Sequence, residues 1–173
     1  MKKIAVIIAN GSEEIETLTP LDVLRRAGVY CDLISVGGKN PTCSHSVTIL
    51  ADKTIENIDF SVYDGIIIPG GMPGATNIAN DQKVVCAIKE FSKNGKLVAA
   101  ICASPAVVLA ANGVVDGKRA TCYPVDDFIK MMGESYVGGS VVIEKNIITA
   151  NGPKAAFEFS MAICDFLGVE AKF

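Results

Sequence analysis

Residues 97–111 read LVAAICASPAVVLAA, in which a strand-like run, a sharp turn and a helix-like run follow one another directly. The first five residues, Leu97–Ile101, are all apolar, which is typical of a strand buried on both faces of a parallel sheet. Ser104 and Pro105 then have the residue types of a helix N-cap and a first helical position, so a helix is predicted from there to Ala111. The stretch is shorter than the roughly 20 apolar residues of a membrane span. It therefore predicts one strand–helix unit of an α/β protein.

The same alternation of strand and helix extends along the rest of the chain. Further apolar runs predict buried strands at Lys3–Ala9, Tyr30–Val36 and Gly65–Ile68. Helices are predicted at Glu14–Ala27, Asp81–Asn94 and Pro153–Leu167, and later strand-like segments are Gly117–Thr121, Tyr136–Val137, Val141–Glu144 and Ile147–Ala150. Pro20 leaves open whether the first helix is one kinked helix or two short pieces. This succession predicts an α/β fold, an open Rossmann-like three-layer sandwich with a mostly parallel central sheet.

The composition limits the classes of protein to which the chain can belong. With 173 residues, of which 50% are apolar and 20% charged, we expect a single domain over residues 1–173 and not a disordered or fibrous chain. The net charge is −3 and no basic cluster exceeds a pair, which argues against binding to nucleic acid or to a membrane surface. The apolar run after the basic start is too short for a signal peptide, so a cytoplasmic location is expected.

The cysteine and histidine content argues against several kinds of metal and disulfide site. The six cysteines include no C-x-x-C pair and are expected to be reduced thiols. His45 is the only histidine, which argues against a zinc finger or a histidine-rich catalytic metal site, and no metal or other cofactor is expected. The glycine-containing runs at 37–39 and 71–74 match no nucleotide-binding motif. His45 lies in a loop after the second strand and is expected at the surface or at an interface.

Three unusual stretches follow directly after predicted central strands. They are residues 10–16 (NGSEEIE), 69–74 (PGGMPG) and 102–105 (CASP). In an open α/β sheet the functional site lies beyond the carboxyl ends of the central strands. The three stretches are therefore predicted to meet at one edge of the sheet and to form the site.

Cys102 is the candidate nucleophile of this site. It lies between a strand and a helix, so a sharp turn should lift its side chain above the sheet, as in a nucleophile elbow. Amides at the start of the following helix favour the thiolate, and Gly70 and Gly71 allow a neighbouring N–H to complete an oxyanion hole with the N–H of Ala103. The alternative is that Cys102 is a small buried hydrophobic residue, as most free cysteines are.

Glu16 is the candidate proton carrier, because it lies one turn into the helix that begins at the end of the first strand. A carboxyl group beside a thiol shares a proton with it, so the two groups titrate jointly. Glu13 and Glu14 are expected to be solvated and to complement the helix dipole.

The other five cysteines fall into two groups. Core packing is expected for the first group. The second group lies in turn-like contexts that allow partial exposure and a secondary redox role, although a structural role is the favoured expectation. The first group is Cys31, Cys86 and Cys164, and the second is Cys43 and Cys122.

In these residues the sequence resembles the DJ-one/ThiJ/PfpI superfamily, and within it the branch of the parkinsonism-associated protein deglycase and bacterial ThiJ-like proteins. The resemblance covers nearly the whole chain. It rests on AxxxEExE…PxDVLRRAG at 9–28, PGGxxGAxN at 69–77, AAICASP at 99–105, TxxPxxD at 121–127 and GPxxxFEFxxAI at 152–163. It implies a flavodoxin-like fold, a homodimer, a nucleophilic Cys102 at a strained elbow, Glu16 as its protonated hydrogen-bond partner, and Gly71 and Ala103 as oxyanion donors.

The sequence departs from the family pattern at three positions. Tyr123 stands where many relatives have a histidine, and His45 stands where relatives bring an arginine to the pocket. Ala103 stands where PfpI-type peptidases have a histidine after the cysteine. Gly70, Tyr123 and His45 are therefore candidate pocket residues, and a Cys–His peptidase is the least favoured function.

The resemblance leaves two functions of different classes. The first is a cofactor-independent glyoxalase or deglycase for methylglyoxal-type dicarbonyls or their adducts, in which Cys102 attacks the aldehyde and Glu16 moves the proton. The second is a redox-sensing stress-response protein in which oxidation of Cys102 is the signal. Both need the same activated thiol, so the residues alone do not separate them. The homodimer is expected to use the first helical segment, with Arg25 and Arg26.

Overall fold

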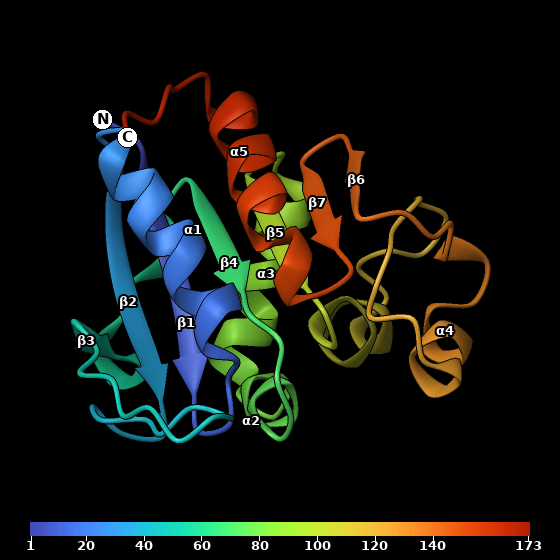
Figure 1. Cartoon of the computed structure of the whole chain (residues 1–173), viewed down its shortest axis with the longest axis horizontal. Helices are drawn as coiled ribbons and strands as arrows, with labels where there is room; N and C mark the ends of the chain where they lie inside the picture. The colour runs from blue at the N-terminus through green and yellow to red at the C-terminus, as the bar shows by residue number, and fades with distance from the viewer.

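The computed structural model describes residues 1–173 and contains one seven-stranded sheet (Figure 1). The strands are β1 (Lys3–Ala9), β2 (Tyr30–Val36), β3 (Lys53–Thr54), β4 (Gly65–Ile68), β5 (Leu97–Ile101), β6 (Val141–Glu144) and β7 (Ile147–Ala150). Their order is β3-β2-β1-β4-β5-β7-β6, and only β6 and β7 pair antiparallel. Without the edge strands β3 and β6 this is the flavodoxin-like order 2-1-3-4-5. The predicted fold class is confirmed.

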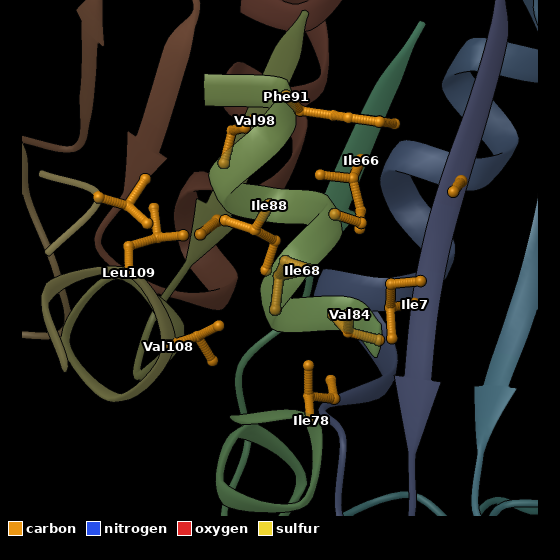
Figure 2. Close-up of a cluster of buried hydrophobic side chains, with 14 of the residues drawn as sticks. Ile7, Ile66, Ile68, Ile78, Val84, Ile88, Phe91, Val98, Val108 and Leu109 are labelled. Carbon is orange, nitrogen blue, oxygen red and sulfur yellow. The ribbon is translucent and has the colours of Figure 1, made fainter. Parts of the chain in front are cut away.

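Helices cover both faces of the sheet and divide the core in two. The helices are α1 (Glu14–Arg26), α2 (Gly74–Ala79), α3 (Gln82–Lys93), α4 (Asp126–Met132) and α5 (Ala156–Leu167). α1 and α5 lie on one face, and α3 lies on the other (Figure 1). Along β1, Val6 belongs to the core under α1 and α5, whereas Ile7 belongs to the opposite core, in which Ile66 and Phe91 are also buried (Figure 2). Because both faces are covered, the central strands are apolar at nearly every position.

The local predictions hold for the central elements. The strands predicted at 3–9, 30–36, 65–68 and 97–101 are present with these bounds. α1 continues through Pro20 as one helix. Its N-cap is Glu13, whose Oε2 accepts a hydrogen bond of 2.8 Å from the N–H of Glu16. The structure thus settles the first helix as a single element that begins beside the end of β1.

The helix predicted after Ser104 differs from the expectation. Residues Pro105–Leu109 form a π-helical turn, and a short 3₁₀ turn completes the segment at Asn112. Ser104 has helical φ and ψ angles and is not a side-chain cap, because its Oγ donates a 2.5 Å hydrogen bond to the buried carbonyl of Pro69. A buried carbonyl needs a donor more than a helix end needs a cap, since unpaired buried polar groups are costly. Ser104 therefore links the turn that follows β5 to the turn that follows β4.

Two predicted strands are wrong, and three elements were not predicted. Gly117–Thr121 and Tyr136–Val137 lie outside the sheet and share only an isolated bridge between Ala120 and Tyr136. Each is short and adjoins glycine or turn residues, so neither offers enough consecutive pairing to extend the sheet past β6. The elements without a prediction are β3, α2 and α4, all of which are seven residues or shorter.

The sheet order places the ends of β1, β4 and β5 side by side. β4 pairs with β1 on one side and with β5 on the other, in parallel. The stretches that follow these strands therefore meet at one edge, as predicted. None of the helices is both long and apolar enough to span a membrane.

Candidate active site

Cys102 is held in a backbone conformation that side-chain-bearing residues rarely adopt. Its φ is +66°, one of three positive values at non-glycine residues. Its N–H donates to the carbonyl of Ala150 (2.9 Å), and its carbonyl accepts from the N–H of Tyr123 (2.8 Å). Such a conformation costs about 1–3 kcal/mol and persists only where the surroundings fix it. The expected strained elbow is confirmed, and the end of β7 and the segment before α4 hold it in place.

Glycine at position 70 permits the close approach of the two candidate catalytic side chains. A Cβ atom at this position would lie 2.6 Å from Cys102 Cβ and 2.6 Å from Glu16 Oε2. Gly71 follows with φ +82°, in the left-handed region that favours glycine. In the turn after β4, the backbone can therefore approach Cys102 and Glu16 closely because no side chain intervenes. This agrees with the close backbone approach predicted for Gly70 and Gly71.

Glu16 is a buried carboxyl with little to stabilise a negative charge. The side chain is fully buried, and its Oε2 accepts a 2.8 Å hydrogen bond from the N–H of Gly70. Its Oε1 has no hydrogen-bond partner of standard geometry. Burial raises the pKa of Glu16 to about 7, and the charge of Glu13 adds to this, while hydrogen bonding to Cys102 and Gly70 opposes it. Near neutral pH a large fraction of Glu16 is therefore protonated.

The thiol of Cys102 competes with Glu16 for one proton. Burial and the neighbouring negative charge and hydrogen bond of Glu16 raise the pKa of Cys102 to about 12, whereas the N–H groups of Gly71 and Ala103 lower it. Protonation of Glu16 removes its negative charge, which is one of the causes that raise this pKa. The sulfur is partly exposed and interacts with two amides, while the carboxyl is fully buried and receives one. The net pKa of Cys102 is therefore raised, not lowered as the amides alone would predict, and near neutral pH the pair holds at least one proton.

Of the remaining predicted pocket residues, Tyr123 adjoins Cys102 and His45 lies beside Glu13 and Glu14 at the start of α1. His45 is exposed, and its Nδ1 lies 3.1 Å from an oxygen of Glu14. Tyr123 is 43% exposed and lines a cavity of about 270 Å³. This cavity is also lined by Pro124, Asn151, Gly152, Pro153 and Lys154. The structure thus brings Gly70 and Gly71 to the Cys102–Glu16 pair, places Tyr123 next to it, and engages His45 with Glu14.

Several side chains differ from their predicted exposure. Glu13 is buried instead of solvated, because it caps α1. Cys43 and Cys122 are buried instead of partly exposed. Cys86 is exposed and not in the core, because it falls between the apolar positions of α3 that face the sheet. Cys31 and Cys164 are buried, as expected.

Two residues that support the site were not identified from the sequence. Ser12 is fully buried, and its Oγ accepts a 3.0 Å hydrogen bond from the N–H of Ala9. Ala150 supplies the carbonyl that holds Cys102. The position of Ala150 at the end of a predicted strand was a usable signal, because the ends of parallel neighbours meet at one edge. Nothing in the residue type of Ser12 distinguishes it from an exposed serine.

Comparison with known proteins identifies related sequences and structures. A family model described as DJ-1/PfpI family matches residues 2–165. "Parkinson disease protein 7 homolog" of Danio rerio is 36% identical over 170 residues, which cover 96% of this chain and 89% of that protein. "Glutathione-independent glyoxalase DJR-1.2" of Caenorhabditis elegans is 36% identical over 157 residues, covering 90% and 83%. The structure "Toxoplasma gondii DJ-1, oxidized" has a TM-score of 0.92 at 37% identity and covers 96% of this chain and 91% of that chain.

The raised pKa of Glu16 predicts a pH dependence of stability. The folded chain binds this proton more tightly than the unfolded chain, so the stabilisation is complete below the unfolded pKa of 4.5 and is lost as the pH rises through about 7. The unfolding free energy of the wild-type protein should fall by about 3 kcal/mol over this range relative to Glu16→Gln, which has no such proton. Urea unfolding of both proteins across this pH range measures the difference. Parallel pH profiles would show that Glu16 has an ordinary pKa.

Proposed function

The chain belongs to the DJ-1/PfpI family, and from this premise we propose that it is a cofactor-independent glyoxalase or deglycase for methylglyoxal-type dicarbonyls, free or as early adducts. The observation that carries the proposal is the Cys102 thiol placed between the amides of Gly71 and Ala103 and against the buried carboxyl of Glu16. A relative of similar length is named as a glutathione-independent glyoxalase, which supports the same reaction class.

The first step is addition of the Cys102 thiolate to the aldehyde carbon. A carbon–sulfur bond forms, and the carbonyl π electrons move to the oxygen. The amides of Gly71 and Ala103, which lie beside the sulfur, are the donors for this oxyanion. Glu16 then gives its proton to the oxygen, which leaves a neutral hemithioacetal and an ionised carboxylate. The pair thus begins the reaction with the charge on sulfur and passes it to Glu16.

The second step moves a hydrogen between the two carbons of the dicarbonyl. The Glu16 carboxylate removes the proton from the former aldehyde carbon and returns a proton to the former ketone carbon. The first carbon is oxidised to a thioester while the second is reduced to an alcohol, so no external oxidant or reductant is needed. Water then cleaves the thioester, which releases lactate from methylglyoxal and restores the thiol. Burial of Glu16 serves this step because it raises the carboxyl pKa to about 7, so that the group can both give and take a proton near neutral pH.

The substrate is proposed to enter beside Tyr123. The N–H of Tyr123 bonds to the carbonyl of Cys102, so the cavity that Tyr123 lines adjoins the elbow. Neither ring nitrogen of the single histidine is needed for the steps above, because Glu16 carries the proton. Tyr123 in place of the histidine of relatives is therefore compatible with turnover.

Lactate formation from methylglyoxal without glutathione tests the proposed reaction. Cys102→Ser should reduce the activity to background, because the adduct forms on the sulfur. Glu16→Gln should lower kcat by about 10²- to 10⁴-fold, because it keeps a neutral hydrogen-bonding group but cannot carry the proton. The matched control is Cys86→Ser, which removes the one cysteine classed as exposed and should leave the rate unchanged. Equal rates in Cys102→Ser and the wild-type protein would disprove the mechanism.

A redox-sensing role is the second candidate, and the environment of Cys102 favours it. Cys102 is partly exposed, whereas Cys31, Cys43, Cys122 and Cys164 are buried. Two successive peroxide molecules would each transfer one oxygen to the sulfur and leave as water, giving a sulfinate. A protonated Glu16 can donate a hydrogen bond to a sulfinate oxygen and so stabilise this product.

Peptide mass spectrometry across a peroxide titration tests this second candidate. Cys102 should be the dominant sulfinate site. Glu16→Asp, which shortens the donor, should slow oxidation or stop it at the sulfenate, while Glu16→Gln should have a milder effect. If the exposed Cys86 oxidises first, or if the three proteins give the same products at Cys102, Glu16 does not tune the thiol and the sensor role loses its mechanism.

We also propose that the chain forms a homodimer through α1. The arginines expected to contribute are paired within the chain, Arg25 with Asp52 (2.6 Å) and Arg26 with Asp22 (2.7 Å). The exposed apolar side chains of α1 are instead Ile15 and Leu18, which are 53% and 38% exposed. These side chains are the better candidates for the contact, because burying them removes apolar surface from water.

Light scattering of the purified protein tests the dimer. The wild-type protein should have twice the mass of the chain, and Ile15→Lys should be a monomer. Ile143→Lys is the matched control, because Ile143 is 54% exposed on the edge strand β6 and should leave the dimer intact. A monomeric wild-type protein, or loss of the dimer only in the control variant, would refute this interface.

A further inference from the structure

Three side chains of the types that ligate metals meet at the start of α1, outside the Cys102–Glu16 pair. Glu13 and Glu14 come from the N-terminus of α1, and His45 comes from the loop between β2 and β3. One ligand atom from each lies within 4.8 Å of the other two. His45 Nδ1 is 3.1 Å from Glu14 Oε2 and 3.8 Å from Glu13 Oε1. We propose that these three residues bind a divalent transition-metal ion.

The spacing of the ligand atoms fits a single ion. Zinc-type ions bind imidazole nitrogen and carboxylate oxygen at about 2.1 Å, so two ligand atoms on one tetrahedral ion lie about 3.4 Å apart. The two distances from His45 Nδ1, 3.1 and 3.8 Å, fall on either side of this value. An ion can therefore contact all three atoms after small side-chain adjustments.

Glu13 supplies a carboxylate oxygen that has no hydrogen-bond partner, in a side chain that is 11% exposed. The residue is only 8% exposed. Its Oε2 is occupied, because it accepts the N–H of Glu16. Its Oε1 makes no hydrogen bond and lies toward His45 Nδ1, its one ion-pair neighbour. A bound cation at this position would give this oxygen a partner.

The charges around the cluster also favour a cation. Neither Glu13 nor Glu14 forms an ion pair with a lysine or arginine, and His45 is the only basic partner of both. Two carboxylates and one imidazole match the ligand preferences of first-row ions such as Zn²⁺ and Ni²⁺, whereas Mg²⁺ and Ca²⁺ prefer oxygen alone. The His45 side chain is 75% exposed, so water can fill the remaining coordination positions. The presence of a single histidine argues against a histidine-rich metal site, but a site with two carboxylates needs only one histidine.

A bound ion would connect the start of α1, the helix that carries Glu16, to the loop between β2 and β3. The loop already contacts the start of α1 through Ser44 N–H to Ser12 O (2.9 Å) and His45 N–H to Glu14 Oε1 (2.7 Å). The ion adds a stronger bridge between the same segments. Because it binds the folded chain, it should stabilise that chain in proportion to its affinity and concentration. The proposal is independent of turnover and of the proposed function.

The single histidine makes the site directly observable. Ni²⁺ is the probe, because it is paramagnetic and broadens the NMR signals of nearby protons. The imidazole signals of His45, unambiguous since no other histidine exists, should broaden and saturate at one Ni²⁺ per chain. Ni²⁺ should also raise the Tm of the protein. Persistence of sharp imidazole signals at excess Ni²⁺ would overturn the proposal.

Variants distinguish the three-residue site from other ways of binding Ni²⁺. His45→Gln and Glu14→Gln should each weaken Ni²⁺ binding, measured by calorimetry, by at least about tenfold. Cys102→Ser and Glu90→Gln, the latter on α3, should bind as the wild-type protein does. Wild-type affinity in Glu14→Gln would mean that His45 alone binds the ion, and loss of binding in Cys102→Ser would place the ion on the thiol. Either result contradicts the proposed site.

Discussion

One proton shared between a buried carboxyl and a partly exposed thiol is the constraint on which the site depends. Glu16 is fully buried with a single amide at one oxygen, and Cys102 has two amides near its sulfur. Two negative charges at this separation repel each other strongly in a buried site, so one group keeps the proton. Both proposed functions require the charge on sulfur and the proton on Glu16, an arrangement that the two amides at the sulfur and the burial of Glu16 favour.

The fold supplies this arrangement by placing three strand ends next to one another. β1 leads into the helix that carries Glu16, β4 leads into Gly70 and Gly71, and β5 ends at Cys102. The apolar cores on both faces of the sheet hold these ends in register. The unfavourable φ of Cys102 persists because hydrogen bonds to Ala150 and Tyr123 hold the backbone on both sides of this residue. Packing of the whole domain thus maintains the strain at one residue.

The sequence predicts those features that arise from local patterns. Continuous apolar runs located the central strands, and a cysteine between a strand and a helix located the elbow at Cys102. Features that depend on distant partners were not predictable in this way. Ser104 has the residue type of a cap but bonds to Pro69, and Glu13 has the residue type of a solvated group but is buried as a cap. The misplacement of Cys86 is different, because the apolar positions of α3 already put this residue on the opposite face of the helix.

The infrared spectrum just below neutral pH tests the location of the shared proton most directly, because it reports protonated carboxyls and thiols together. The account predicts a protonated carboxyl band that is absent from Glu16→Gln. It also predicts that Cys102→Ser removes no S–H band, since the proposed reaction begins from an ionised Cys102. An S–H band that disappears in Cys102→Ser, together with an ionised Glu16, would contradict the account.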